Sequence, residues 1–139
     1  MALWSLTSQE RTRLMLWRTG NSTFRVVQYD EPADMLSNSD YILFDQKYES
    51  VLQQLKGQID FLAVTVTDGV RHLVWDNYLE VRIRRSLEID AIPAYSGHGL
   101  DMYRFGEESV YVSEALKEAF EKVSPQKLRF SLGLSEFAA

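Results

Sequence analysis

The strongest constraint on the fold comes from residues 110–130, which read VYVSEALKEAFEKVSPQKLRF. A β-branched and aromatic run leads into Ser113, a preferred N-cap residue, and Pro125 stops the helix that follows. Apolar residues recur at helical spacing at Leu116, Ala119, Phe120 and Val123, and then in alternation at Leu128, Phe130, Leu132 and Leu134. The stretch predicts a strand, a capped helix and a half-buried closing strand, and none of its residues indicates catalysis.

The composition is that of an ordinary globular domain. The 139 residues fit one domain, with a hydrophobic fraction of 45% and a charged fraction of 25%. No apolar run approaches the roughly 20 residues of a membrane span, and the first residues, MALWSLTSQERTR, lack the apolar core of a signal peptide. The absence of cysteine excludes disulfides, thiol nucleophiles and cysteine-ligated zinc. We therefore expect a cytoplasmic protein that does not bind membranes.

The N-terminal region supports two interpretations. Thr7 and Glu10 have the spacing of a capping box, which predicts a helix over residues 8–18 that ends near Gly20. The competing interpretation is a strand over residues 13–17 that turns at Gly20 and Asn21 into a second strand. We favour the helix. The segment 24–29 is β-rich in either case and stops at the loop signal of residues 30–32.

The middle of the chain predicts a short strand, a helix and a hairpin. An apolar run covers residues 41–44, and Asp45 is a plausible N-cap for a helix whose apolar positions are Tyr48, Val51, Leu52 and Leu55 and which ends at Gly57. Residues 61–66 and 70–75 flank Asp68-Gly69, a pair favoured in two-residue hairpin turns. That turn would pair Thr67 with Val70, Thr65 with His72 and Val64 with Leu73. One face would then hold Leu62, Val64, Val66, Leu73 and Trp75.

Two more strand signals complete the pattern. Residues 79–89 alternate between apolar and charged side chains, which indicates a strand at least through Ile83, with Glu80 on its polar face. A second hairpin joins residues 102–105 to residues 110–112 across a loop that contains Gly106. We therefore predict one α+β domain over residues 1–139, with a mostly antiparallel sheet covered by a few helices.

No set of residues makes a convincing catalytic or metal site. The chain has only two histidines, and no HxH or HExxH spacing is present. His72 falls in a predicted strand and is interpreted as a surface residue. His98 lies between two glycines in a loop, but the sequence supplies no partner for it as a general base. We predict no catalytic residue, no metal and no cofactor.

Two other groups of residues have structural interpretations. Arg82, Arg84 and Arg85 form the one basic cluster, and we expect Glu80 and Glu88 to neutralise it. The large aromatic residues Trp17, Trp75 and Tyr78 are interpreted mainly as core. Any of them left exposed would become a contact hot spot for a partner, because hot spots are enriched in tryptophan and tyrosine.

The acidic residues point to a basic protein partner. Fifteen Lys and Arg against twenty Asp and Glu give a net charge of −5, which disfavours nucleic acid and favours encounter with a basic surface. Acids gather in or beside predicted loops, where they are solvated and available for docking. The predicted partner-binding residues are Asp34, Asp40, Asp45, Glu49, Glu107 and Glu108.

The last third of the chain resembles a family of immunity proteins from bacterial polymorphic toxin systems. The resemblance rests on residues 89–90, 99–105, 110–114, 116–117, 120 and 128–130, including the "VSE" helix start and the Leu-Arg-Phe of the closing strand. Family members often place a glycine between the helix and the last strand, where this chain has Ser124-Pro125-Gln126.

The resemblance implies a non-enzymatic inhibitor that binds a cognate toxin domain in the cytoplasm, and it brings no catalytic residue with it. With the acidic charge, this leads us to expect that the chain occludes a basic effector, such as a nuclease. Two alternatives stay open. One is a small enzyme with a site centred on His98, and the other is a homo-oligomeric adaptor with a self-complementary apolar patch.

Overall fold

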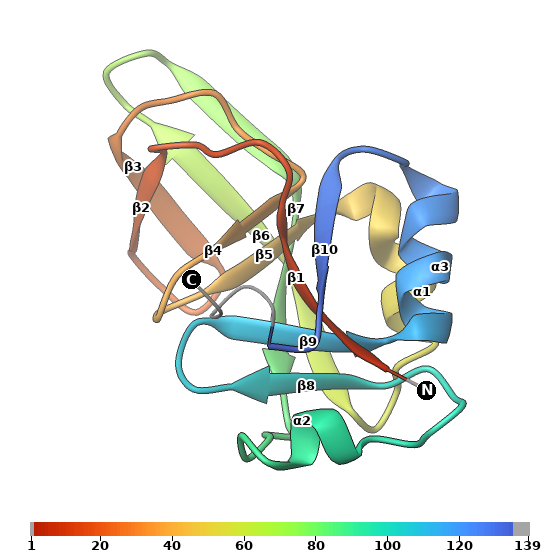
Figure 1. Cartoon of the computed structure of the whole chain (residues 1–139). Helices are drawn as coiled ribbons and strands as arrows, with labels where there is room; N and C mark the ends of the chain where they lie inside the picture. The colour runs from red at the N-terminus through yellow and green to blue at the C-terminus, as the bar shows by residue number, and fades with distance from the viewer. Residues whose placement is uncertain (1, 135–139) are drawn as a thin grey trace.

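The computed structural model describes residues 2–134, which form two β-sheets with short helices beside them (Figure 1). The four-stranded sheet is antiparallel throughout and joins the two ends of the chain, with Leu6 opposite Phe130. Its strands lie in the order β10 (Leu128–Leu132), β1 (Leu3–Ser8), β9 (Ser109–Ser113) and β8 (Met102–Phe105). The predicted α+β domain with a mostly antiparallel sheet is therefore confirmed.

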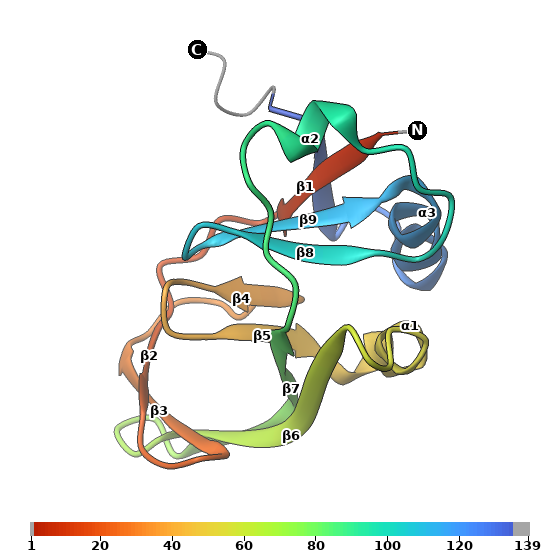
Figure 2. The ribbon, with the colours of Figure 1, turned by 90° about the horizontal axis from the view of Figure 1, so that it is seen from below.

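The six-stranded sheet curls on itself, and we call it the half-barrel (Figure 2). Its strands lie in the order β2 (Met15–Arg18), β3 (Thr23–Gln28), β6 (Ile59–Asp68), β7 (Leu73–Ile83), β5 (Ile42–Asp45) and β4 (Met35–Ser37). Within this sheet β3 and β6 pair in parallel, and the other neighbouring strands pair antiparallel. The outer edge of β2 is partly closed by a side chain, because the Leu16 N–H donates to the Tyr41 hydroxyl at 3.3 Å.

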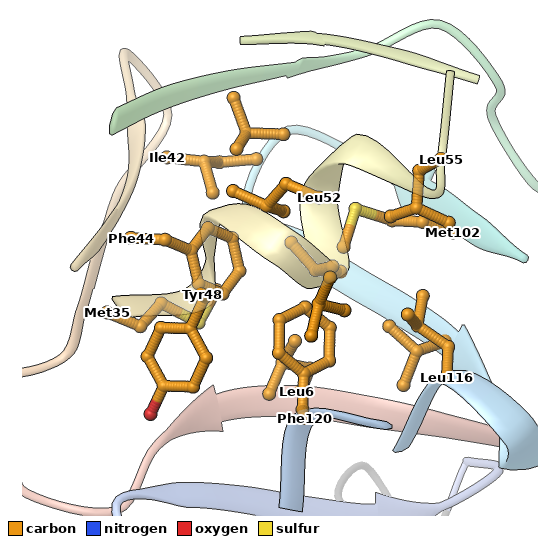
Figure 3. Packing of buried hydrophobic residues seen from close by; sticks show 14 of the residues in the cluster. Leu6, Met35, Ile42, Phe44, Tyr48, Leu52, Leu55, Met102, Leu116 and Phe120 are labelled. Carbon is orange, nitrogen blue, oxygen red and sulfur yellow. The ribbon is translucent and has the colours of Figure 1, made fainter. Parts of the chain in front are cut away.

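Two apolar clusters fill the molecule. The interior of the half-barrel holds side chains from all six of its strands, among them Leu16, Phe24, Val64 and Tyr78. The larger cluster lies where the helices meet both sheets (Figure 3). At its centre, the ring of Phe120 stacks on Phe44 with centroids 5.5 Å apart, and Tyr48 packs edge-on against both.

Two of the three predicted helix starts, Asp45 and Ser113, are confirmed, although the helix after Asp45 ends at Gln53 and not at Gly57. The Ser113 hydroxyl accepts from the Leu116 N–H at the start of α3 (Glu114–Val123). Asp45 caps the 3₁₀ turn η1 (Gln46–Tyr48), which continues into α1 (Glu49–Gln53). A further short helix, α2 (Ala91–Ala94), lies in the long connection between β7 and β8. The hairpin of β8 and β9 and the strand through Ile83 are also as predicted.

The predicted helix over residues 8–18 is wrong, and the competing two-strand interpretation is right. Thr7 belongs to β1 and pairs with Arg129, while Glu10 forms a 3.0 Å ion pair with Lys127 instead of closing a capping box. In β2 the exposure alternates with period two, since Leu16 is 5% exposed and Trp17 is 62% exposed. Pairing with β10 therefore overrides the local helix signal.

The first hairpin forms with a different register. Asp68 pairs with Leu73 and Thr67 with Val74, so the loop has four residues, 69–72, instead of two. The buried Asp68 carboxylate accepts from the N–H groups of Val70 and Arg71, which fixes the longer loop. The residue with positive φ is His72 at 56°, not Gly69. An aspartate-capped loop thus replaces the predicted turn.

Candidate functional site

An ion pair between Arg18 and Glu80 spans one end of the half-barrel. Arg18 on β2 and Glu80 on β7 both point into this opening, and the guanidinium donates to both carboxylate oxygens, at 3.1 Å and 2.5 Å. The guanidinium also lies over the Phe24 ring, 4.7 Å from its centroid. Glu80, predicted on the polar face of its strand, is only 2% exposed. We call this end of the half-barrel the mouth.

Electrostatics explains why a charged residue is tolerated there. A buried carboxylate is costly unless a cation with well-directed hydrogen bonds compensates it. Arg18 provides these bonds, and the pairing with Glu80 raises the pKa of Arg18 above its usual value. Arg82 adds a weaker contact to Glu80 at 3.8 Å. The mouth therefore has a neutralised floor instead of an unpaired charge.

A cleft of about 370 Å³ opens over this floor. Its walls come from both sheets: Asp40 from the loop before β5, Arg82 from β7, Arg104 from β8 and Glu107 from the β8–β9 turn. Small-molecule and partner groups often bind in the mouths of barrels. The mixed charges of these walls suit a polar partner surface better than an apolar ligand.

Three of the six predicted partner-binding acids lie at this cleft or beside it. Asp40 and Glu107 line it, and Glu108 is the exposed neighbour of Glu107 in the same turn. The Asp40 side chain is 55% exposed and lies 3.6 Å from the Arg18 guanidinium. The fold thus brings together acids from two loops that are far apart in the sequence.

The other three acids are engaged elsewhere. The Asp34 side chain, 14% exposed, accepts from the Tyr48 hydroxyl at 2.5 Å and pairs with Lys47 at 2.6 Å. Burial, followed by this hydrogen bond, raises the pKa of Tyr48. Asp45 caps η1 and accepts from Asn77, and Glu49 accepts from a glutamine one turn along α1. Asp34 and Asp45 therefore hold the β4–β5–η1 region together.

The two histidines lie apart from the mouth. His72 occupies the β6–β7 loop, and His98 lies in the connection that follows α2. Among the residues from 2 to 134, neither imidazole makes a hydrogen bond or ion pair with a carboxylate or hydroxyl group. Within the same part of the chain, no three His, Cys, Asp or Glu side chains are grouped so that they could hold a metal ion.

The predicted basic cluster is divided among several partners. Arg84 forms a bidentate pair with Asp60, at 2.5 Å and 2.9 Å, and Arg85 pairs with Asp101 at 3.0 Å. Arg82 contacts Glu80 as expected. Within residues 2–134, however, Glu88 forms no ion pair with any of the three arginines. The cluster therefore consists of separate contacts and does not form one basic patch.

Sequence reasoning placed Trp17 in the core, and this is wrong. Trp17 points out of the half-barrel with 62% of its surface exposed, whereas Tyr78 is buried and Trp75 is half-buried. Residues 14–17 are all apolar, so strand periodicity puts Leu16 and Trp17 on opposite faces without indicating which face is buried. The pairing of Trp17 with the exposed Arg25 on β3 decides that Trp17 faces outward.

Comparison with known proteins gives no relative: no protein-family model, curated protein or solved structure matches the chain. Among the described residues, no helix is both long and apolar enough to span a bilayer. Any functional conclusion therefore depends on the structure itself, and first on the geometry of the mouth.

Proposed function

We propose that this chain is a cytoplasmic immunity protein of a bacterial polymorphic toxin system, which binds a cognate toxin domain and occludes its working surface. The observation that carries the proposal is the position of Asp40 and Glu107. These two exposed acids come from separate loops and line one open cleft of about 370 Å³ beside the further acid Glu108. A protruding basic side chain of a partner fits such a cleft.

The charges of the mouth give this interface its character. Arg18 satisfies Glu80, so the floor is neutral, and the accessible charges are those of the walls. Glu107 and Glu108 offer acceptors to a basic partner, while Arg82 and Arg104 offer donors to its carboxylates or carbonyl groups. Paired charges of both signs fix the orientation of a partner more than they deepen affinity.

The segment that resembles immunity proteins has a structural role here. It supplies β8, β9, α3 and β10, and its central residue Phe120 is fully buried. Recognition therefore has to come from loops and strand ends outside this core. The mouth meets that requirement, since it draws on β2, β7 and two loops at the junction of the sheets.

The proposed mechanism is occlusion without chemistry. The net charge of −5 steers a basic toxin domain toward the chain, and docking at Asp40, Glu107 and Glu108 of the mouth then covers the toxin's substrate groove. An interface of the usual size, about 1,600 Å² in total, is sufficient for a stable complex when it excludes water at its centre.

The test is protection of cells from the effector encoded beside this chain. Co-expression of the wild type should protect, and the two proteins should purify as a one-to-one complex. Asp40→Lys combined with Glu107→Lys should weaken both results. Glu88→Lys with Asp90→Lys is the matched control, because these acids are exposed and lie outside the mouth. Failure of the wild type to bind or protect against any neighbouring gene product would refute the proposal.

A further inference from the structure

The outer face of the half-barrel carries an ordered row of exposed side chains. Trp17 on β2 lies opposite Arg25 on β3, Arg25 is level with Thr67 on β6, and Thr67 lies opposite Val74 on β7. All four are exposed, because their neighbours along each strand point into the half-barrel. Figure 1 shows β2 and β3 at the end of the molecule away from α1 and α3.

This face is unusually apolar for a surface. Trp17 is 62% exposed, Val74 is 61%, Met15 is 52% and Val27 is 42%. Met15 and Val27 lie on one side of this row, toward the β6–β7 loop, which carries the exposed Val70. Exposed apolar side chains gathered on one rigid surface mark an interaction site.

The face also carries one cation and one anion. Within residues 2–134 the Arg25 guanidinium makes no hydrogen bond or ion pair. Asp76 is exposed on β7 and faces the same way, since its carboxylate accepts from the Thr65 hydroxyl at 3.0 Å. These two charges balance, so this surface does not favour a basic partner.

We infer that this outer face binds a second copy of the same chain. A two-fold axis that runs along β6 places β3 of one copy over β7 of the other. Arg25 then comes within side-chain reach of Asp76 of the second copy, and the symmetry repeats this pair on the other side of the axis. Trp17 and Val27 flank Val74 of the second copy in the same arrangement. The face is thus complementary to itself in both charge and hydrophobicity.

Face-to-face packing suits this region better than addition of a strand at its edge. The Leu16 N–H, on the free edge of β2, already donates to the Tyr41 hydroxyl. The Arg18 guanidinium donates to the Asp40 carbonyl at 3.2 Å beside it. A partner strand would have to displace these contacts, whereas a second copy on the outer face leaves them intact.

The area of the outer face sets the expected affinity of the dimer. Four strands about 4.8 Å apart, each contributing about five residues of about 3.3 Å, give a footprint of about 300 Å². Stable interfaces bury about 800 Å² per partner, so this dimer belongs to the weak class. We expect a dissociation constant in the micromolar range and a mass that rises with concentration.

Sedimentation equilibrium from about 10 to about 500 µM tests the inference, because this range brackets a micromolar dissociation constant. Arg25→Glu and Asp76→Arg should each weaken dimerisation about tenfold or more, since each variant opposes like charges. The double variant that carries both changes should regain dimerisation to within about threefold of the wild type, because the pair is restored with reversed signs. Arg129→Glu and Glu118→Arg are matched controls on other exposed surfaces.

The dimerisation experiment can be distinguished from the test of toxin binding. Changes at the mouth should leave the dimer unchanged, and changes on the outer face should leave one-to-one toxin binding per chain unchanged. A wild type that stays monomeric at the highest concentration overturns the inference without any variant. So does a folded double variant that fails to recover, or a Trp17→Ala variant that dimerises like the wild type.

Discussion

Arg18 on the edge strand β2 and Glu80 on the inner strand β7 make a two-pronged ion pair across the mouth of the half-barrel. The two side chains are not equally buried: Arg18 is 27% exposed and Glu80 is 3% exposed. Each also has a second, weaker partner: Asp40 lies 3.6 Å from Arg18, and Arg82 lies 3.8 Å from Glu80. Because Glu80 is the more deeply buried of the two, we expect removal of Arg18 and removal of Glu80 to lower the free energy of unfolding by different amounts.

Arg18→Met should be the more damaging change. It leaves the Glu80 carboxylate buried without its main cation, for which a loss of about 3–5 kcal/mol is typical. Glu80→Gln should cost less, because a neutral amide still hydrogen-bonds and Arg18 retains Asp40 and solvent. Urea unfolding measures both, with Arg104→Met as an exposed control from the same cleft. Equal losses for the two variants would contradict this account of the pair.

Phe120→Ala should destabilise the protein by about 3–5 kcal/mol, because it deletes a large side chain from a close-packed core. Phe120 is fully buried, stacked on Phe44 and edge-on to Tyr48 (Figure 3). Lys122→Ala, at an exposed position of the same helix, is the control and should change stability little. A Phe120→Ala variant with unchanged stability and lost binding would instead assign this helix to the interface.

Stability should fall at alkaline pH because of buried tyrosines, among them Tyr48 and Tyr78. Burial is the main cause that raises the pKa of Tyr48 and Tyr78, with nearby Asp34 and Asp45 adding to it. Between the unfolded pKa near 10 and the raised folded pKa, only the unfolded state loses its proton. Stability is therefore full below about pH 10 and declines above it, by up to about 1.4 kcal/mol per pH unit for each tyrosine.

Urea unfolding at a series of pH values from neutral to about pH 11 checks this prediction. Tyr78→Phe should lower stability at neutral pH, because it removes the 2.8 Å hydrogen bond to the Ala33 carbonyl. The same variant should also decline less steeply above about pH 10, because one titrating group is gone. A slope identical to that of the wild type would show that Tyr78 ionises freely in the folded state.

Local rules in the sequence were sufficient where the interacting groups are close along the chain. Ser113 and Asp45 cap helices within three residues of themselves, and both were predicted. The helix over residues 8–18 was wrongly preferred to the two-strand interpretation because the partners of Thr7 and Glu10 lie at Arg129 and Lys127, at the other end of the chain. A capping-box spacing carries no information about such partners.

The mouth was only partly predictable for a similar reason. Charge and loop position identified Asp40 and Glu107, but nothing in the sequence joins Arg18 to Glu80, whose strands are separated by β3 and β6 in the sheet. The alternation of residues 79–83 even placed Glu80 on a polar face. That face is directed into the mouth of the curled sheet, and curvature of this kind depends on the whole sheet.

The last prediction concerns the kinetics of toxin binding. Glu107→Lys with Glu108→Lys should slow association with the cognate effector and flatten its dependence on salt, while stability changes little, because both glutamates are exposed. Asp34 is unsuitable for such a test, since its contacts with Lys47 and Tyr48 make it part of the fold. Association rates measured against ionic strength, with Glu88→Lys and Asp90→Lys as the control, provide the comparison. A wild-type rate that does not respond to salt would remove electrostatic steering from the mechanism, and equal slowing by the control would assign the effect to net charge instead of the mouth.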